Sequence, residues 1–197
     1  MTSAFPVRRV TLALTAALAA LALVLAHAAS AEANTYYTVL QAEHSGKFVT
    51  TDYGQGAGAV AFQWYNADWP ESQWFVDNHD GKGGFRWKSR WNGLCLDLEN
   101  NSTAAGTRVV QMPCDGTLSQ EWTYNSAQDS GSQFYRHIRN EYAKLVMDVS
   151  GGSTAAGAQI IIWPRHGGTN QRFNIIGRSD DAAARTPSLA ARAADRP

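Results

Sequence analysis

The sequence predicts an all-β domain that consists of three consecutive repeats of about 50 residues each. The first observation is that residues 94–122 and 145–173 align without a gap, 51 positions apart, with 10 of 29 positions identical. Average composition would give roughly two identities by chance. The second observation is a fainter upstream copy, in which Gly58, Gln63 and Trp74 recur 48 positions later. A period of this size indicates a repeat architecture.

Residues 1–33 are predicted to be a secretory signal peptide. Arg8 and Arg9 give a basic start, residues 10–25 form a run rich in Ala and Leu, and small residues follow at spacings suited to cleavage. The apolar run is short for a membrane span, and a signal anchor is the alternative. We therefore expect a secreted, extracellular protein with no membrane span, folded in an oxidising compartment.

The folded domain is expected over residues 34–177, with repeats at about 35–82, 83–131 and 132–177. No window after position 34 has a helical apolar period, so short strands separated by turns rich in Gly and Ser are predicted instead. Four strands in each repeat would give about twelve in total. The clearest candidate strands are residues 37–40, 47–51, 59–62, 73–76, 85–88 and 134–139.

The segment 178–197 has a different composition from the domain. It consists mainly of Ala, Arg, Asp and Pro, with almost no large apolar side chain. Such a segment cannot bury enough surface to offset its loss of entropy on ordering, so a disordered tail is predicted. A linker stub and a short amphipathic helix are the alternatives.

The charge balance gives no electrostatic reason to expect nucleic acid or an anionic membrane as a partner. Lys and Arg number 17, equal to Asp and Glu, and the formal net charge is zero. Seven Trp in a chain with only 17% charged residues must be either buried or used for binding. We expect a monomer whose partner is not a polyanion.

No catalytic or metal-binding pattern is found, so neither an enzyme nor a cofactor is expected. The histidines after the signal segment lack metal-ligand spacing, and no G-x-S-x-G segment is present. Asp97 and Asp148 occupy equivalent positions in different repeats. A threefold arrangement would hold these two carboxylates apart, which argues against an acid/base pair.

The two cysteines, Cys95 and Cys114, lie 19 positions apart in the second repeat. In a secreted chain they are expected to form one disulfide. Free thiols or a metal pair are minor alternatives. The third repeat has Val146 and Arg165 at these positions, so the bridge is a local feature of one repeat.

Five segments resemble motifs of the ricin B-chain-type lectins, which include carbohydrate-binding modules of family 13 attached to bacterial xylanases. QEW at 120–122 and QRF at 171–173 are similar to the Q-x-W motif of the family. LCLDL at 94–98 and PC at 113–114 resemble its C-x-D-V and W-P-C segments, and GGTNQ at 167–171 resembles its G-x-x-N-Q segment. The resemblance implies a β-trefoil, a six-stranded barrel capped by three hairpins, with pseudo-threefold symmetry.

The resemblance also implies a sugar site in the third repeat. The family holds a sugar with an Asp that accepts hydrogen bonds from two hydroxyls, an aromatic ring that stacks on the sugar, an Asn donor and a Gln that supports the Asp. Asp148, Trp163, Asn170 and Gln171 complete this set, and His166 is a further candidate contact. The family often has a polar residue where this chain has Ile161, so one hydrogen bond to the sugar is expected to be missing.

The other two repeats are predicted to be incomplete. The second keeps Asp97 and Gln120, but Met112 replaces the aromatic residue and Ser119 replaces the Asn, which makes it a degenerate second site. The first has Trp64 at the aromatic position, whereas its aligned residues at the Asp, Asn and Gln positions are Thr51, Glu71 and Ser72. One working site is therefore expected.

The Q-x-W aromatic residues are predicted to form the core. Trp74, Trp122 and Phe173 recur at the same position in each repeat, which favours a shared structural role over binding. A buried Trp also needs an acceptor for its N–H. The Gln of the motif is expected to brace the Asp and the neighbouring backbone by hydrogen bonds.

The resulting functional prediction is non-catalytic binding of galactose-type sugars or a related polysaccharide such as xylan, mainly through the third repeat. The alternatives are a small secreted glycosidase and a trefoil protease inhibitor or protein-binding scaffold. The glycosidase would need a second carboxylate at the sugar site. The scaffold would use an exposed loop and would leave the complete third-repeat set without a role.

Overall fold

A computed structural model describes residues 36–52, 55–78, 84–124 and 134–179. The described residues contain twelve β-strands and several three-residue 3-10 turns. All of them belong to the unit Thr35–Pro197, while the expected signal peptide at 1–33 lies outside the described residues. In the part of the chain that the structure describes, no helix is long and apolar enough to cross a membrane.

Six strands close into a barrel. β12 pairs with both β1 and β9, β1 pairs with β4, β4 with β5, and β8 with β9. The ring closes between β5 and β8, where Phe85 and Trp122 exchange two backbone hydrogen bonds of 3.0 and 2.9 Å. The barrel strands are β1 (Tyr37–Ala42), β4 (Trp74–Asp77), β5 (Arg86–Ser89), β8 (Trp122–Tyr124), β9 (Tyr135–Asn140) and β12 (Arg172–Arg178).

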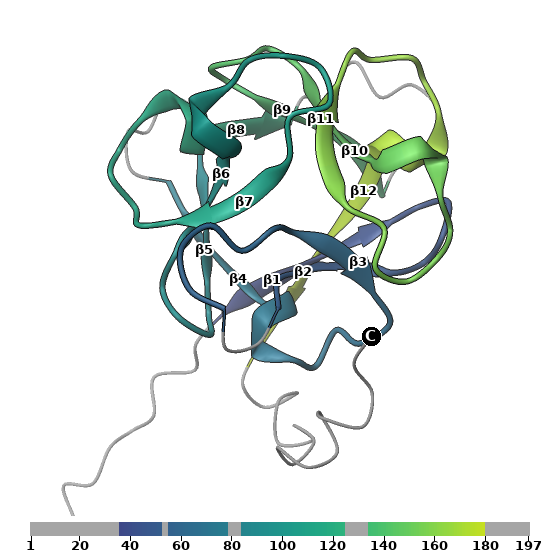
Figure 1. Ribbon diagram of the computed structural model, residues 1–197. Helices are drawn as coiled ribbons and strands as arrows, with labels where there is room; N and C mark the ends of the chain where they lie inside the picture. Colours follow the sequence, from purple (N-terminus) through teal and green to yellow (C-terminus); the bar gives the residue numbers. More distant parts are fainter. Residues whose placement is uncertain (1–35, 53–54, 79–83, 125–133, 180–197) are drawn as a thin grey trace, which may run out of the picture. The chain divides into compact units, whose positions relative to one another are not determined.

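The other six strands form three hairpins that lie around a common centre (Figure 1). Adjacent hairpins are joined through the bridges Val60 to Val110, Phe62 to Gln159 and Arg108 to Ile161. A six-stranded barrel with three hairpins is the architecture of a β-trefoil, so the predicted fold is confirmed. The hairpins are β2 (Phe48–Thr50) with β3 (Phe62–Trp64), β6 (Cys95–Leu98) with β7 (Val109–Met112), and β10 (Val146–Val149) with β11 (Ile160–Trp163).

The repeated aromatic residues lie in the core, as predicted. Trp74, Trp122 and Phe173 are fully buried and belong to one cluster of apolar side chains. The indole N–H of Trp74 donates to the Val49 carbonyl at 3.3 Å, and that of Trp122 donates to the Leu96 carbonyl at 3.1 Å. The buried rings therefore keep their single polar group satisfied.

These two hydrogen bonds correct the alignment of the first repeat. Val49 corresponds to Leu96, an offset of 47 positions (96 − 49), whereas matching Thr51 to Asp97 implied an offset of 46 (97 − 51). Thr50, and not Thr51, therefore occupies the position of Asp97. A slip of one residue moves every side chain of a strand to the opposite face, so this correction decides which threonine lies on the face that carries Asp97 and Asp148 in the other repeats.

Two predicted boundaries also differ from the structure. The run 59–62 was expected to be a strand, but β3 begins at Phe62. The preceding backbone bonds instead to the neighbouring hairpin, since Ala61 N–H donates to the Val109 carbonyl at 2.8 Å. At the other end, Arg178 belongs to β12 and its guanidinium contacts Asp68 at 2.8 Å, so the predicted tail starts too early. Residues 180–197 lie outside the described residues.

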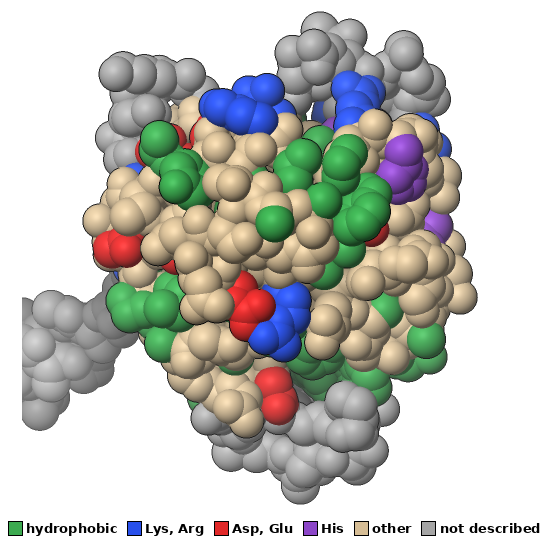
Figure 2. Space-filling model, turned by 45° about the horizontal axis from the view of Figure 1, so that its top comes forward, with side chains coloured by type: hydrophobic (Ala, Val, Ile, Leu, Met, Phe, Trp, Pro, Cys, Tyr) green, Lys and Arg blue, Asp and Glu red, His purple; other side chains and the backbone are tan. Residues whose placement is uncertain are grey.

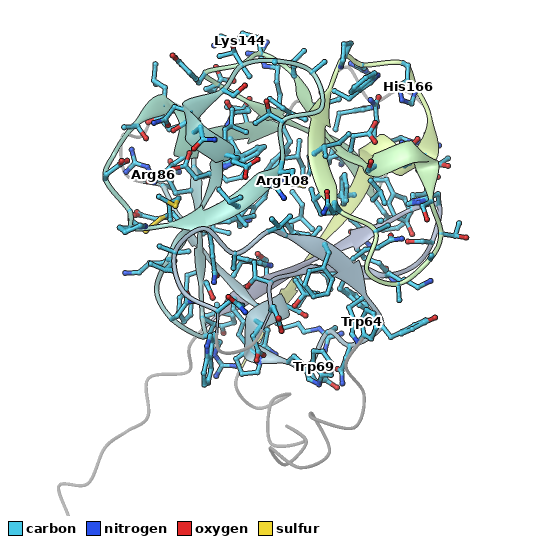
Figure 3. The ribbon with its side chains drawn as sticks, in the orientation of Figure 1. Trp64, Trp69, Arg86, Arg108, Lys144 and His166 are labelled. Atoms are coloured by element: carbon cyan, nitrogen blue, oxygen red, sulfur yellow. A yellow bond between two sulfur atoms is a disulfide. The ribbon has the colours of Figure 1, made fainter. Side chains whose placement is uncertain are left out.

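Cys95 and Cys114 form the expected disulfide. It joins β6 to the segment just after β7. Figure 3 shows this bond in yellow, close to the Arg86 label. Across the face shown in Figure 2, basic and acidic side chains lie in small separate groups. This distribution agrees with the balanced composition.

Candidate functional site

A pocket of about 520 Å³ opens on the third repeat, beside the β10–β11 hairpin. Asp148 of β10 lies directly opposite Ile161 of β11, and residues opposite each other share a face of the sheet. Trp163 lies two residues beyond Ile161, so its ring projects from that same face. The alternate positions of both strands, including Met147 and Ile162, are buried in the core. Strand alternation thus separates the pocket face from the core face.

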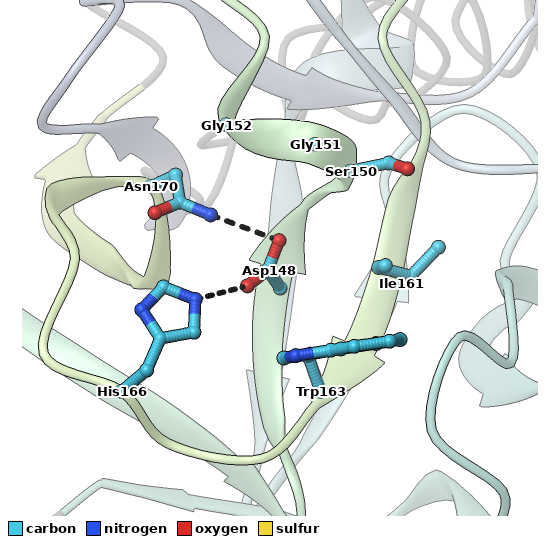
Figure 4. A pocket seen from close by; sticks show the side chains of 8 residues that line it. All are labelled: Asp148, Ser150, Gly151, Gly152, Ile161, Trp163, His166 and Asn170. Carbon is cyan, nitrogen blue, oxygen red and sulfur yellow. Dashed lines mark hydrogen bonds and ion pairs between the residues drawn. The ribbon is translucent and has the colours of Figure 1, made fainter.

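Asp148 forms the polar centre of this pocket (Figure 4). Its side chain is only 4% exposed. One carboxylate oxygen, Oδ1, accepts from Asn170 Nδ2 at 3.0 Å; the other, Oδ2, accepts from Gln171 Nε2 at 2.8 Å and lies 3.3 Å from His166 Nε2. A buried carboxylate is tolerated when it is hydrogen-bonded in this way. Its two oxygens together offer about four acceptor positions, so one is left for a ligand hydroxyl beside those three donors.

Gln171 braces this carboxylate against the loop that follows β11. Its Nε2 also donates to the Pro164 carbonyl at 2.9 Å, and its Oε1 accepts from His166 N–H at 2.9 Å. Gln120 makes the same three kinds of contact in the second repeat, to Asp97, Pro113 and the Asp115 N–H. The structural role predicted for the Q-x-W glutamine is confirmed in both repeats.

Trp163 provides the aromatic wall of the pocket. Its side chain is exposed, at 42% of its full surface, unlike the buried core tryptophans. Ile161 beside it adds a second apolar surface and no hydrogen-bonding group. The pocket thus combines one accessible ring face with one buried carboxylate, an arrangement suited to a ligand that has both an apolar face and hydroxyl groups.

Three residues of the pocket wall were missed in the sequence, namely Ser150, Gly151 and Gly152. Gly151 and Gly152 have positive φ angles of 65° and 63°. Asn100 and Asn101 adopt the same left-handed conformation in the second repeat, with φ values of 54° and 53°. Gly and Asn are the residues that tolerate this conformation best. The pairing of Gly-Gly with Asn-Asn at matching positions was therefore the signal for this turn.

The second repeat keeps the frame of the site but changes its contacts. Asp97 is buried and still accepts from Gln120, but its Oδ1 accepts from its neighbour Leu98 N–H at 2.6 Å, because the shorter Ser119 cannot reach it. Met112 offers no ring. Asp115 occupies the place of His166, and hydrogen bonds from Thr117 hold the pKa of its carboxyl below the ordinary value.

The first repeat does not form a comparable site. Trp64 was matched to the stacking position, yet it is only 7% exposed and packs edge-on against Phe62 and Tyr65 at centroid distances of 6.2 and 5.6 Å. Thr50 supplies no carboxylate, and Glu71 is buried. Of the three predicted sets, only the third repeat brings an Asp, an accessible ring, an Asn and a Gln together.

The pocket contains a single carboxylate among its described lining residues, that of Asp148. The usual glycosidase mechanism requires a pair of carboxyl groups that flank the scissile bond. Within the described ranges, no group of three or more His, Cys, Asp or Glu residues is placed to hold a metal ion.

A β-trefoil with a ring-and-carboxylate pocket on one hairpin defines the class of three-repeat lectin-like proteins. A model of the ricin-type beta-trefoil lectin domain-like family matches residues 24–112, 71–163 and 118–193. The chain therefore belongs to this family. No curated protein matches the chain.

Solved structures support the same assignment. A designed threefold-symmetric protein, ThreeFoil, is 30% identical, with a TM-score of 0.66 over 72% of this chain and 97% of that one. The exo-beta-1,3-galactanase 1,3Gal43A from Clostridium thermocellum is 26% identical, with a TM-score of 0.66 over 73% of this chain, which spans 30% of the galactanase. The Macrolepiota procera ricin B-like lectin, solved with lactose, is 21% identical, with a TM-score of 0.61 over 74% of this chain and 97% of the lectin, and shares the fold.

Proposed function

We propose that this protein is a secreted, non-catalytic carbohydrate-binding protein that recognises galactose-type sugars, or a related polysaccharide such as xylan, through the third-repeat pocket. The observation that carries the proposal is the convergence of a buried, braced carboxylate and an exposed indole ring, Asp148 and Trp163, on one pocket. Family membership supports the same function.

The chemistry of a pyranose matches these groups. One face of the sugar ring is rich in C–H groups and would stack on Trp163, while hydroxyls at its edge would donate to Asp148 and meet Asn170. Hydrogen bonds to a charged group contribute about 1.5–3 kcal/mol each. One shallow pocket with one ring then corresponds to a Kd of about 0.01–1 mM, or −7 to −4 kcal/mol.

Galactosides are the sugars to test first. The galactanase that resembles this chain is named for a galactose polymer, and the Macrolepiota procera lectin is described in complex with lactose. Of two neighbouring galactose hydroxyls, one axial and one equatorial, one would donate to the free acceptor position of Asp148 and the other would meet the Asn170 side chain. Xylan is the second class, and xylobiose is its soluble probe.

Calorimetry with galactose, lactose and xylobiose tests the proposal, and a glycan array extends it to longer sugars. We expect saturable binding of one sugar class at one site per chain. Two or three equivalent sites would contradict the assignment to the third repeat, and hydrolysis of chromogenic glycosides by the purified protein would contradict a non-catalytic role. Mass spectrometry of the exported protein should find a start between Ala29 and Thr35; an intact Met1 would contradict secretion through a cleaved signal.

A further inference from the structure

The His166 ring is held at both of its nitrogen atoms. On one side, Nε2 lies 3.3 Å from Asp148 Oδ2. On the other side, Nδ1 accepts the backbone N–H of Gly168 at 3.2 Å. A nitrogen that accepts a hydrogen bond carries no proton, so the proton of the neutral ring must be on Nε2. The Gly168 amide therefore selects the tautomer that donates to Asp148.

A side chain at position 168 is constrained by space and not by backbone conformation. The φ of Gly168, −66°, is open to any residue. A Cβ atom at this position, however, would lie 2.5 Å from Asn170 Oδ1 and 2.7 Å from His166 Cε1. The backbone of Gly168 thus fits between the imidazole and the amide that flank Asp148. Any side chain would push apart these two neighbours of the carboxylate.

We propose that Gly168 is the positioning residue that holds His166 in its Nε2–H form, and that sugar binding consequently weakens when His166 gains a second proton. This inference rests on the proposed sugar-binding function of the pocket. A proton added to Nδ1 would face the Gly168 N–H, and two donors cannot bond to each other, so either the imidazole or the Gly168 backbone must shift. The resulting imidazolium would also bond the Asp148 oxygen more strongly than the neutral ring does, and so compete better with sugar hydroxyls for it.

The charged groups around the His166 ring come from three parts of the fold. Histidine is the side chain that ordinarily changes charge between about pH 5 and 8. Asp148 faces the ring from β10, and Arg165 precedes it in its own loop. Arg108, which forms a β-bridge with Ile161, makes an ion pair with Glu99. The hydrogen bond between these two side chains lowers the pKa of Glu99 and raises the pKa of Arg108. Both members of this pair keep their charge over that pH range.

A second histidine near the pocket provides a control. His44 Nε2 bonds to the Ser153 carbonyl at 2.8 Å, one residue beyond the Gly152 wall, but it is not among the lining residues. His44→Gln should therefore leave the pH profile of sugar binding in place. His166→Gln should remove the profile, because an amide donates to Asp148 but does not titrate.

The ring can be examined directly and without any sugar. In ¹⁵N-histidine-labelled protein at pH 8, the nitrogen spectrum of His166 should show the proton on Nε2 and an unprotonated Nδ1. The protonated-Nδ1 form, or an even mixture of the two tautomers, would overturn the inference. Because this measurement needs no ligand, it decides the tautomer even if the proposed sugar-binding function fails.

Calorimetry with lactose, or with whichever probe binds, then tests the consequence. From pH 7.5 to pH 5.0 we expect the Kd of the unmodified protein and of His44→Gln to rise at least about threefold, and that of His166→Gln to stay constant. A constant Kd for the unmodified protein, or an equal rise for His166→Gln, would overturn the inference. A protein that binds no sugar at any pH would instead contradict the proposed function.

Gly168→Ala completes the test. Its Cβ should displace His166 and Asn170, so we expect a Kd at least about tenfold higher at pH 7.5 and loss of the uniform Nε2–H signal. Gly177→Ala is the matched control, because a Cβ there meets nothing within 4 Å. Unfolding curves of both variants show whether each is folded. A folded Gly168→Ala with the binding and tautomer of the unmodified protein would overturn the inference.

Discussion

Asn170 donates its amide to Oδ1 of Asp148 at 3.0 Å, and this contact distinguishes the complete pocket from its degenerate copy. In the second repeat, the same oxygen of Asp97 accepts from the adjacent backbone N–H of Leu98. The amide of Asn170 therefore holds the carboxylate from the pocket side and itself stays within reach of a ligand. The two carboxylates are about equally buried, so the difference between the two sites lies in the donor to Oδ1 and not in the exposure of the Asp.

Trp163→Ala should abolish sugar binding with little loss of stability. The indole is the only Trp, Tyr or Phe ring among the described lining residues of the pocket, and it is 42% exposed, so truncation removes the stacking surface without opening the core. We expect the free energy of unfolding to fall by about 1 kcal/mol or less. Calorimetry and urea unfolding measure the two effects, and Trp163→Phe, which keeps a ring, should retain part of the affinity. Unchanged affinity in Trp163→Ala would place the sugar elsewhere.

Phe173→Ala should have the opposite effect. Phe173 is fully buried in the main apolar cluster, so the substitution leaves a cavity in the barrel. Substitutions of this type cost about 3–5 kcal/mol. Urea unfolding should show this loss, while any protein that remains folded should bind sugar with little change. A loss below about 1 kcal/mol would mean that the barrel interior collapses around the missing ring.

The sequence predicts the fold through its repetition. The second and third hairpins have the same register, 51 positions apart, because residues that must alternate between core and pocket recur at a fixed spacing. The set Asp148, Trp163, Asn170 and Gln171 came instead from the resemblance to the lectin family, and the structure places these residues together; their role in sugar binding stays a prediction.

The parts that could not be predicted depend on three-dimensional contacts. The first repeat is aligned by Gly58, Gln63 and Trp74, which all follow β2, so the sequence does not tell Thr50 from Thr51 at the Asp position. The burial of Trp64 depends on its packing against Phe62 and Tyr65. The need for Gly168 arises from atoms of His166 and Asn170 that meet only in the folded chain.

Glu141→Gln should destabilise the protein at neutral pH and much less in acid. Burial alone would raise the pKa of Glu141, but hydrogen bonds from Lys144, Thr123 and Arg139 outweigh it and lower the pKa to about 2. A pKa below the unfolded value of about 4.5 means that the carboxylate stabilises the fold above that pH and that this contribution disappears as pH falls toward 2. Solvent screening at the exposed Lys144 and Arg139 limits it to about 1–2 kcal/mol.

Urea unfolding of this variant between pH 7 and pH 2.5 measures the effect. The difference from the unmodified protein should be largest at pH 7 and shrink below pH 4.5. Glu99→Gln is a suitable control, because the Glu99 side chain is 30% exposed against 18% for Glu141, so a smaller change is expected. A difference that does not depend on pH would show that Glu141 acts through packing.

Replacing Cys95 and Cys114 with Ser should lower stability without affecting the sugar site. The bridge spans 19 positions, and closing a loop of that length contributes roughly 3 kcal/mol in the chain-entropy model. The bridge belongs to the second repeat, whereas the pocket residues belong to the third. Thermal unfolding and calorimetry of the double variant should therefore show a lower Tm and an unchanged Kd. A changed Kd would reveal coupling between the two hairpins.

Met112→Trp combined with Ser119→Asn should create a second sugar site. The second repeat already has the braced carboxylate, since Gln120 contacts Asp97 and Pro113 as Gln171 contacts Asp148 and Pro164. The new Trp would supply the missing ring. The new Asn would reach Asp97 Oδ1 and take it from the Leu98 N–H, as Asn170 takes that oxygen in the third repeat.

The test is made in a protein that also carries Trp163→Ala, in which the native site should not bind sugar. Any saturable heat of sugar binding in that protein therefore comes from the new site. We expect weaker affinity than at the third repeat for two reasons: Asp115 replaces His166 beside the carboxylate, and Ser119 is only 2% exposed, so a longer side chain must displace its neighbours. Met112→Trp alone is the matched control and should bind nothing measurable, because Asp97 would remain tied to its own backbone. If the variant with both substitutions folds but shows no heat of sugar binding, equal spacing in the two repeats does not produce equal pocket geometry. A binding group that is displaced by about 1 Å loses most of its effect.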